Sequence, residues 1–145
     1  MSTIAVKKLN EKAMLPTYGS PEAAGADLYA CLEESVTIGA GETAFIPTGL
    51  AMDVPKGCAG LIYARSSLGT KRGLAPANKV GVIDSDYRGQ VMVALHNHGK
   101  VSQTIAHGER IAQLLITPVL TPSYEEAQEL TDTARGQGGF GSTGK

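Results

Sequence analysis

The residues with the most evident chemistry lie between Asn78 and Gly89, where alternating apolar residues and glycine lead into a dense polar cluster. Asp84 and Asp86 are two residues apart, so an extended chain would place both carboxylates on the same side. Beside the ring of Tyr87 and the guanidinium of Arg88, they could act as a general base, hold a metal ion or form an ion pair. The pattern predicts a β-hairpin that presents these groups. A purely structural turn, tied by Asp86 and Arg88, is the competing interpretation.

A second polar cluster, at Arg65, Ser66 and Ser67, supplies a guanidinium and two hydroxyls. With Gly69 following, the segment has the serine-first, glycine-last outline of one helical turn. Cationic side chains, hydroxyls and a helix N-terminus all favour phosphate. The alternative is an ordinary helix cap with a solvated arginine.

Three weaker clusters complete the polar candidates. Arg110 and Gln113 lie at the entry to an apolar strand, where a salt-bridged turn is the structural alternative. Ala24–Asp27 could equally be a surface bend. His96 and His98 would share one strand face and could ligate a metal, but the sequence suggests no third ligand nearby.

The segment Arg135–Lys145 contains five glycines and one large apolar side chain, Phe140. It cannot bury enough surface to order itself, so by itself it should be mobile. Its end imitates a P-loop up to the lysine, but no Ser or Thr follows and no strand of the right kind precedes it, so a Walker A loop is not expected. The glycine-rich backbone, with Arg135, Ser142 and Thr143, could still wrap an anion, and Phe140 could stack on an aromatic base.

The elements that must position these groups belong to a single domain of 145 residues, a length sufficient to bury a core. The net charge of −1 disfavours binding to a nucleic-acid backbone. Two cysteines and an N-terminus without an apolar signal core favour an intracellular, cytoplasmic protein with free thiols, or a nuclear or organellar one if the source is eukaryotic. No apolar run approaches the roughly 20 residues needed to cross a bilayer, so no membrane partner is expected.

Short strands recurring between turn signals, with only one helical turn, predict an all-β sandwich or jelly roll. Tyr124–Leu130 could form a helical turn or an extended strand. The run from Gln90 to Leu95 is apolar after its glutamine, so both faces of that strand are expected to be covered. Strands are expected at Ile4–Leu9, Ala24–Cys31, Val36–Ile38, Thr43–Val54 with an interruption at Pro47 and Gly49, Ala59–Ala64, Gln90–Leu95, near Ile105, at Ile111–Ile116 and at Val119.

Taken in chain order, the polar clusters resemble the five sequence motifs of the trimeric dUTP diphosphatase family, commonly called dUTPase. Any one motif alone is weak, but five at compatible spacings, ending in Gly-Phe-Gly-Ser-Thr-Gly, are highly specific. Ala64 stands where the family usually has proline, Ser67 where it has glycine, and Glu109 where aspartate is commoner. The five matching segments are Ala24–Leu28, Arg65–Gly69, Gly81–Gly89, Gly108–Leu115 and Arg135–Gly144.

The resemblance implies a jelly-roll homotrimer, with a core over residues 1–134 and a flexible arm over residues 135–145. Each active site would form at a subunit boundary and be closed by the arm of another subunit. The implied reaction is hydrolysis of dUTP to dUMP and diphosphate, which limits uracil incorporation into DNA and supplies dUMP for thymidylate synthesis. The implied cofactor is Mg²⁺, gripped chiefly by the triphosphate. The implied partners are the substrate dUTP and the two further copies of the chain that complete the homotrimer, with no nucleic acid and no membrane.

The resemblance also implies roles for the residues of the third motif. Asp84 would orient and deprotonate the water that attacks the α-phosphorus. Asn78, with main-chain groups around Gly81 and Val82, would read the uracil edge and leave cytosine mispaired. Tyr87 would pack on the deoxyribose and collide with a 2′-hydroxyl, which would reject UTP. The tight backbone would exclude the 5-methyl group of dTTP.

The other motifs would hold the triphosphate and close the site. Phe140 would stack on uracil, and Asp27 would act on Mg²⁺ only through water. The residues implied to hold the phosphates are Arg65, Ser66, Ser67 and Gln113 from the core, joined by Arg135, Gly141, Ser142 and Thr143 from the arm.

Two other functions remain open from the sequence. dCTP deaminase shares this fold, but that branch usually has tryptophan where Tyr87 stands, and this chain has no tryptophan. The second possibility is a non-catalytic jelly-roll trimer, which would bind nucleotide as a sensor or serve as a scaffold. The presence of Asp84 argues against this possibility without refuting it.

Overall fold

A computed structural model describes residues 3–144, and almost every regular element in this range is a short strand. The only helix in the described part, α1, spans Ser66–Arg72. The strands are β1 (Val6–Lys8), β2 (Thr17–Tyr18), β3 (Ala26–Tyr29), β4 (Val36–Ile38), β5 (Thr43–Pro47), β6 (Leu50–Met52), β7 (Cys58–Tyr63), β8 (Leu74–Pro76), β9 (Gly81–Ile83), β10 (Met92–Asn97), β11 (Gln103–Ile105) and β12 (Arg110–Pro118).

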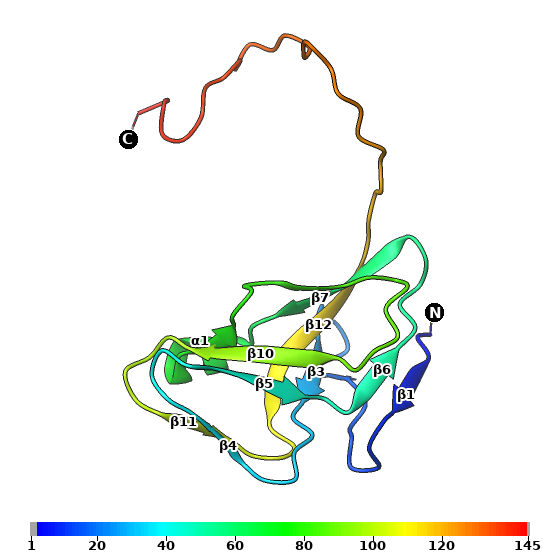
Figure 1. The fold of residues 1–145 in the computed structure, drawn as a ribbon, viewed down its shortest axis with the longest axis vertical. Coiled ribbons are helices and arrows are strands. Elements are labelled where there is room, and N and C mark those ends of the chain that lie inside the picture. Colours follow the sequence, from blue (N-terminus) through cyan, green and yellow to red (C-terminus); the bar gives the residue numbers. More distant parts are fainter. Residues whose placement is uncertain (1–2, 145) are drawn as a thin grey trace.

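The strands pair antiparallel in four sheets, and most neighbours are far apart in the sequence (Figure 1). The largest sheet has the order β2-β3-β12-β7-β9, and a second has the order β5-β10-β8. Two smaller pairs, β1 with β6 and β4 with β11, complete the body. This topology confirms the expected all-β jelly-roll class.

One apolar core lies between these sheets and contains residues from all four. Leu28 of β3 comes from the largest sheet, Leu95 of β10 from the second, Ile105 of β11 from one small pair and Met52 of β6 from the other. These four side chains are buried. Alternation of buried and exposed positions along the strands therefore determines which face of each sheet turns inward.

Two local expectations were wrong. The helix does not end at Gly69 but runs on to Arg72, and Gly73 ends it in a left-handed conformation at φ 66°. In β10 the burial alternates, with Met92 38% exposed and Val93 1% exposed, so only one face of that strand is covered within the single chain.

The chain leaves the body after β12, whose last residue is Pro118. Residues 119–144 form neither helix nor strand, so the strand expected at Val119 was wrong and the helical turn or strand considered for Tyr124–Leu130 is absent. Val119 holds the start of this C-terminal segment, because its N–H donates to Gly57 O at 2.9 Å. Beyond Val119 the segment extends away from the sheets (Figure 1). The expected division between a core ending at residue 134 and an arm over residues 135–145 that closes over ligand stays a prediction.

No helix among the described residues is long and apolar enough to span a bilayer.

Candidate active site

The residues expected to read the base and activate water gather around β9. A cavity of about 240 Å³ is lined by Asn78, Gly81, Val82, Asp84 and Tyr87, together with Ile62, Ile83, Gln90, Val91 and Met92. β9 is the last strand of its sheet and pairs through Gly81 with Ile62 of β7. The opposite edge of its backbone therefore remains available for hydrogen bonds to a ligand.

The segment after β9 is a turn and not the second strand of a hairpin. β9 ends at Ile83, its partner is β7, and the N–H of Tyr87 donates to Asp84 O at 3.1 Å. The hairpin and the alternation expected for Asp84 and Asp86 were therefore wrong, because period-2 geometry applies only within an extended strand. Asp84 lines the cavity and Asp86 does not.

Arg88 fixes this turn through Asp53 and not through Asp86, the partner that the competing interpretation assigned to it. Its Nη2 donates to Asp53 Oδ1 at 2.7 Å, and its Nη1 donates to the main-chain oxygens of Ser85 at 2.8 Å and Tyr87 at 3.1 Å. The Arg88 and Asp53 side chains are more than half exposed, so the ion pair contributes little by itself. The bonds to backbone carbonyls define the shape of the turn that carries Asp84.

Tyr87 is held across the mouth of the cavity by its own hydroxyl. The hydroxyl donates to Gln90 O at 2.8 Å, and the side chain of Gln90 accepts a hydrogen bond from Gly49 N at 2.9 Å. The ring also lies directly over Gly89: a Cβ added there would be 2.6 Å from Tyr87 Cζ. A residue with any side chain at position 89 would push the ring away.

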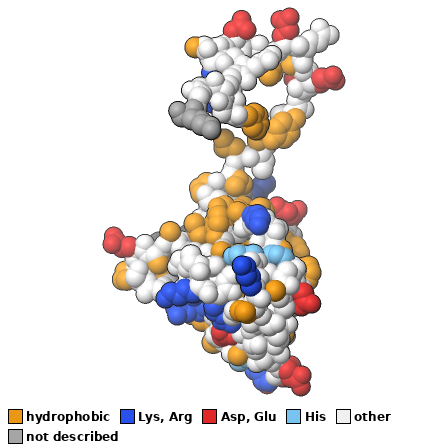
Figure 2. Space-filling model, turned by 90° about the vertical axis from the view of Figure 1, so that its left-hand side faces the viewer, with side chains coloured by type: hydrophobic (Ala, Val, Ile, Leu, Met, Phe, Trp, Pro, Cys, Tyr) orange, Lys and Arg blue, Asp and Glu red, His pale blue; other side chains and the backbone are white. Residues whose placement is uncertain are grey.

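A different cavity, of about 520 Å³, is lined by two of the core residues expected to bind phosphate, whereas the other two, Ser66 and Gln113, do not line it. Its wall contains Arg65 and Ser67 from the start of α1 and Arg110 from the start of β12, together with Leu68, Lys71, Arg72, Gly108 and Glu109. Four cationic side chains against one carboxylate give this cavity an electropositive lining suited to polyphosphate. Figure 2 shows several Lys and Arg side chains gathered on one side of the body.

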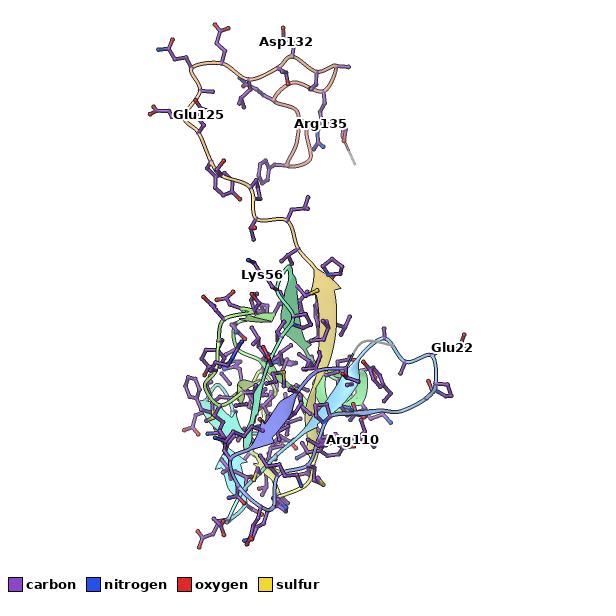
Figure 3. All side chains as sticks on the ribbon, turned by 90° about the vertical axis from the view of Figure 1, so that its right-hand side faces the viewer. Glu22, Lys56, Arg110, Glu125, Asp132 and Arg135 are labelled. Atoms are coloured by element: carbon purple, nitrogen blue, oxygen red, sulfur yellow. The ribbon has the colours of Figure 1, made fainter. Side chains whose placement is uncertain are left out.

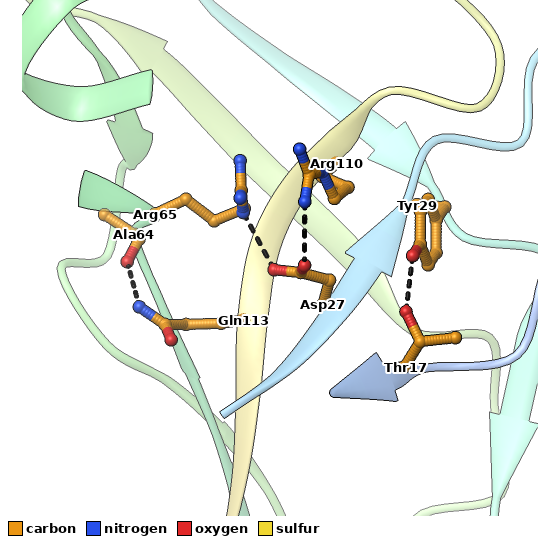
Figure 4. Close-up of polar contacts among 7 residues, drawn as sticks. All are labelled: Thr17, Asp27, Tyr29, Ala64, Arg65, Arg110 and Gln113. Atoms are coloured by element: carbon orange, nitrogen blue, oxygen red, sulfur yellow. Dashed lines mark hydrogen bonds and ion pairs between the residues drawn. The ribbon is translucent and has the colours of Figure 1, made fainter. Parts of the chain in front are cut away.

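Asp27 lies between two of these arginines (Figure 4). Its Oδ1 accepts from Arg65 Nε at 2.8 Å, and its Oδ2 lies 3.5 Å from Arg110 Nη1. The side chain of Asp27 is 13% exposed and that of Arg65 is 22% exposed, so this ion pair is largely shielded from water. Asp27 therefore orients Arg65 and joins β3 to the start of α1.

Gln113 is occupied with the backbone just before Arg65. Its Nε2 donates to Ala64 O at 2.8 Å (Figure 4). The Gln113 side chain also packs closely against Gly25, where an added Cβ would lie 3.2 Å from Gln113 Cβ. Its direct contact with phosphate stays a prediction. The observed contact fixes the chain that leads into Arg65 and Ser66.

The arm residues are far from both cavities. Arg135, labelled on the arm in Figure 3, is well separated from Arg110 on the body. The arm's contacts are local: Arg135 Nε donates to Gly138 O at 2.7 Å, and Ser142 N donates to Gly139 O at 3.0 Å. Phe140 is fully exposed. In this conformation the arm reaches neither cavity, so the roles expected for Phe140, Gly141, Ser142 and Thr143 stay predictions.

The single chain therefore forms two separate cavities. One presents the expected base-reading and water-activating residues, the other presents Arg65 and Ser67 of the expected phosphate-binding residues, and the two cavities share no lining residue. The sequence reading missed Asp53, Gln90 and Arg72, which position these residues. Their partners are 35, 41 and up to 37 residues away in the sequence, so no local pattern could reveal them.

Asp27 is the residue that the resemblance connects with magnesium, and only through water. Among residues 3–144, no group of three His, Cys, Asp or Glu side chains is placed to hold a metal. Both oxygens of Asp27 already face arginines. Each carboxylate oxygen keeps a lone pair that could accept from a metal-bound water.

The chain matches the dUTPase family model over residues 11–144. It is 46% identical over 142 residues to the deoxyuridine 5′-triphosphate nucleotidohydrolase of Syntrophotalea carbinolica, covering 98% of this chain and 97% of that protein. It is 48% identical over 139 residues to the enzyme of the same name from Hahella chejuensis, covering 95% and 91%.

Solved structures agree with this match. The dUTPase of Staphylococcus bacteriophage 80alpha with dUpNHpp superposes with a TM-score of 0.91 at 29% identity, covering all of both chains. A mutant dUTPase from S. aureus phage phi11, which coordinates a structural Mg(II) ion, gives a TM-score of 0.80 at 26% identity, covering 88% of this chain and 98% of that one. The match in sequence spans all five motifs, and the match in structure spans the body. The chain belongs to the dUTPase family.

Proposed function

We propose that the protein hydrolyses dUTP to dUMP and diphosphate. Family membership supports this reaction, and the observation that carries it is the cavity beside β9. There, Asn78, Gly81, Asp84 and Tyr87 line one volume of about 240 Å³, next to an unpaired strand edge. A base-sized pocket with a carboxylate at its rim suits hydrolysis of a nucleotide at the phosphate next to the sugar.

Asp84 is the proposed general base. It follows directly after β9, and the turn that holds it is fixed by the contacts of Arg88 with Ser85 O and Tyr87 O. Such fixation matters because phosphoryl transfer relies on positioning the water and stabilising charge more than on covalent chemistry. The carboxylate accepts the proton of the water as that water attacks the α-phosphorus.

The backbone of β9 is the proposed reader of uracil. At Gly81 and Val82 the main-chain groups that do not bond to β7 lie on the strand's other edge, and Asn78 adds a side-chain amide. Uracil offers an N–H between two carbonyls, whereas cytosine would leave these groups mispaired. Such mismatches reduce turnover of the wrong substrate by roughly 10⁴-fold or more.

The active unit is proposed to be a homotrimer in which different copies complete each site. Asp84 and Arg65 line separate cavities, and the arm with Arg135 extends away from both. The outer face of β5 and β10 supports association, since Phe45 is 70% exposed and Met92 is 38% exposed. Apolar side chains on an open sheet face typically mark an interface between subunits.

Magnesium is proposed to enter as the complex with the triphosphate, where it neutralises phosphate charge. Arg65 and Ser67, which line the larger cavity, and the neighbouring Ser66 would contact the phosphate oxygens directly. Asp27 would reach the ion only through water. Arg135, Ser142 and Thr143 would add donors from the arm, while Phe140 stacks on uracil.

The test is a side-by-side measurement of diphosphate release from dUTP, dCTP, UTP and dTTP with magnesium, together with ammonia release from dCTP. Rapid release from dUTP alone would establish the proposed reaction. Ammonia from dCTP would assign the protein to the deaminase branch instead. Absence of turnover across the panel would favour a binding trimer.

Tyr87→Ala is expected to raise the kcat/KM for UTP relative to that for dUTP by roughly 10-fold to 100-fold. The ring lines the cavity, and removing it leaves room for a 2′-hydroxyl. Competition between the two nucleotides measures the ratio directly. Tyr87→Phe is the control, since it keeps the ring and loses only the bond to Gln90 O. An unaltered ratio in the alanine variant would show that sugar selection lies elsewhere.

Gly89→Ala is expected to shift the same ratio in the same direction. The backbone at Gly89 is not in the left-handed region, so alanine fits there, but its Cβ would displace the ring of Tyr87. Gly19→Ala is the matched control, because nothing lies within 4 Å of a Cβ at that position. If both variants keep the parent's ratio of kcat/KM for UTP to that for dUTP, the ring position does not depend on Gly89.

A further inference from the structure

Arg72, the last residue of α1, joins three segments of the chain. Its Nε donates to Gln103 Oε1 on β11 at 3.0 Å, and its Nη2 donates to Thr104 O at 2.6 Å. Its Nη1 donates to Glu109 Oε1 at 2.8 Å, just before β12. Glu109 in turn uses Oε2 to accept from Ala106 N at 2.5 Å. One guanidinium therefore fixes the helix to a strand and to the turn that precedes another.

The same segments carry the cationic groups of the 520 Å³ cavity. α1 begins immediately after Arg65, and β12 begins at Arg110, the residue after Glu109. At its N-terminal end the helix is tied by Arg65 to Asp27, which also faces Arg110. At its C-terminal end it is tied by the contacts of Arg72. These contacts at both ends restrict rotation and sliding of the short helix relative to β12.

We propose that Arg72 and Glu109 are positioning residues that hold the phosphate-binding groups of α1 and β12 in register. The inference rests on the proposed function, because it assigns the contacts of this cavity to a nucleoside triphosphate. Glu109 carries the argument: a carboxylate in the wall of a polyphosphate site opposes anion binding through its charge. Its two hydrogen bonds, to Arg72 and to the Ala106 backbone, supply a structural reason for its presence.

Charge and position predict opposite results for Glu109→Gln. This change removes a negative charge, so on electrostatic grounds a triphosphate should bind more tightly. The change also replaces one of the two carboxylate oxygens with an NH₂ group, so either Ala106 N–H or Arg72 loses its acceptor and that contact opens. If the position of the phosphate-binding groups matters more than the charge, the affinity for the triphosphate falls. Arg72→Lys provides the second variant, since lysine keeps the charge but cannot reach three acceptors in fork geometry.

The experiment compares binding of dUMP, dUDP and the non-hydrolysable α,β-imido analogue of dUTP by calorimetry, with magnesium, on the full-length protein. For both variants we expect the Kd of the imido analogue to rise about 10-fold to 100-fold, because displacing binding groups by about 1 Å can have an effect of up to this size. The rise should be smaller for dUDP and absent for dUMP. Glu33→Gln is the matched control: Glu33 pairs with Lys12 at 2.9 Å, and neither lines a cavity described above.

Equal or tighter binding of the imido analogue by Glu109→Gln would overturn the proposal. So would a loss of the same size for dUMP, which would indicate general disruption and not a shift of phosphate groups. If one variant fails to fold, the other still decides between charge and position. A parent protein that binds no imido analogue and releases no diphosphate from dUTP would instead overturn the proposed function. Measurements on the parent protein therefore distinguish failure of the proposed function from failure of the positioning proposal.

Discussion

Asp84→Asn is expected to reduce dUTP hydrolysis by roughly 10²–10⁴-fold or more, the range in which a general base usually contributes. Binding should persist, because asparagine has nearly the same shape and the uracil-reading backbone of β9 is unchanged. Removing a carboxylate near the phosphates also removes a repulsion, so the imido analogue should bind the variant at least as tightly. Single-turnover hydrolysis and calorimetry measure the two quantities separately.

The matched control is Asp86→Asn, which makes the same chemical change in the same turn. Asp86 does not line the cavity, so this variant should keep most of the activity. An unchanged rate in Asp84→Asn would exclude Asp84 as the base. Loss of binding together with the rate would mean that the carboxylate orders the site instead of activating water.

Deleting residues 135–145 is expected to leave a folded protein that hydrolyses dUTP at least about 10²-fold more slowly, the size of effect that misplaced binding groups can have. Among residues 3–144 the last strand ends at Pro118, and the hydrogen bonds of Arg135 to Gly138 O and of Ser142 to Gly139 O lie within the arm, so the melting temperature should not change. The arm contributes only on closure, where its ordering is offset by contacts with substrate. Phe140→Ala, which keeps the arm's backbone, should cause a smaller loss.

Mixing two inactive variants tests whether the arm serves a neighbouring subunit. The deletion variant retains Asp84 but lacks the arm, and full-length Asp84→Asn retains the arm but lacks the base. After joint refolding, mixed trimers should regain part of the parent's activity. If each arm closed only over its own Asp84, no mixture would be active. Full activity in the deletion variant alone would remove the arm from the mechanism.

The class of fold and the family could be predicted from the sequence. Short apolar runs between turn residues predict strands wherever the pattern is local, as at Val36–Ile38 and Thr43–Pro47. The glycines of Arg135–Lys145 and its single large apolar residue predict a segment unable to pack by itself. The polar clusters reveal function because catalytic groups of a given family occur at fixed local spacings.

Tertiary structure alone decided which groups meet. Asp84 and Asp86 look equivalent in the sequence, but β9 ends at Ile83 and the turn that follows places only Asp84 at the cavity. Likewise Arg88 finds Asp53 and not the nearby Asp86, and Arg72 finds Glu109 across 37 residues. Such pairs depend on the order of strands in the sheets, which is set by non-local packing of one shared core. Local residue patterns contain no information about that order.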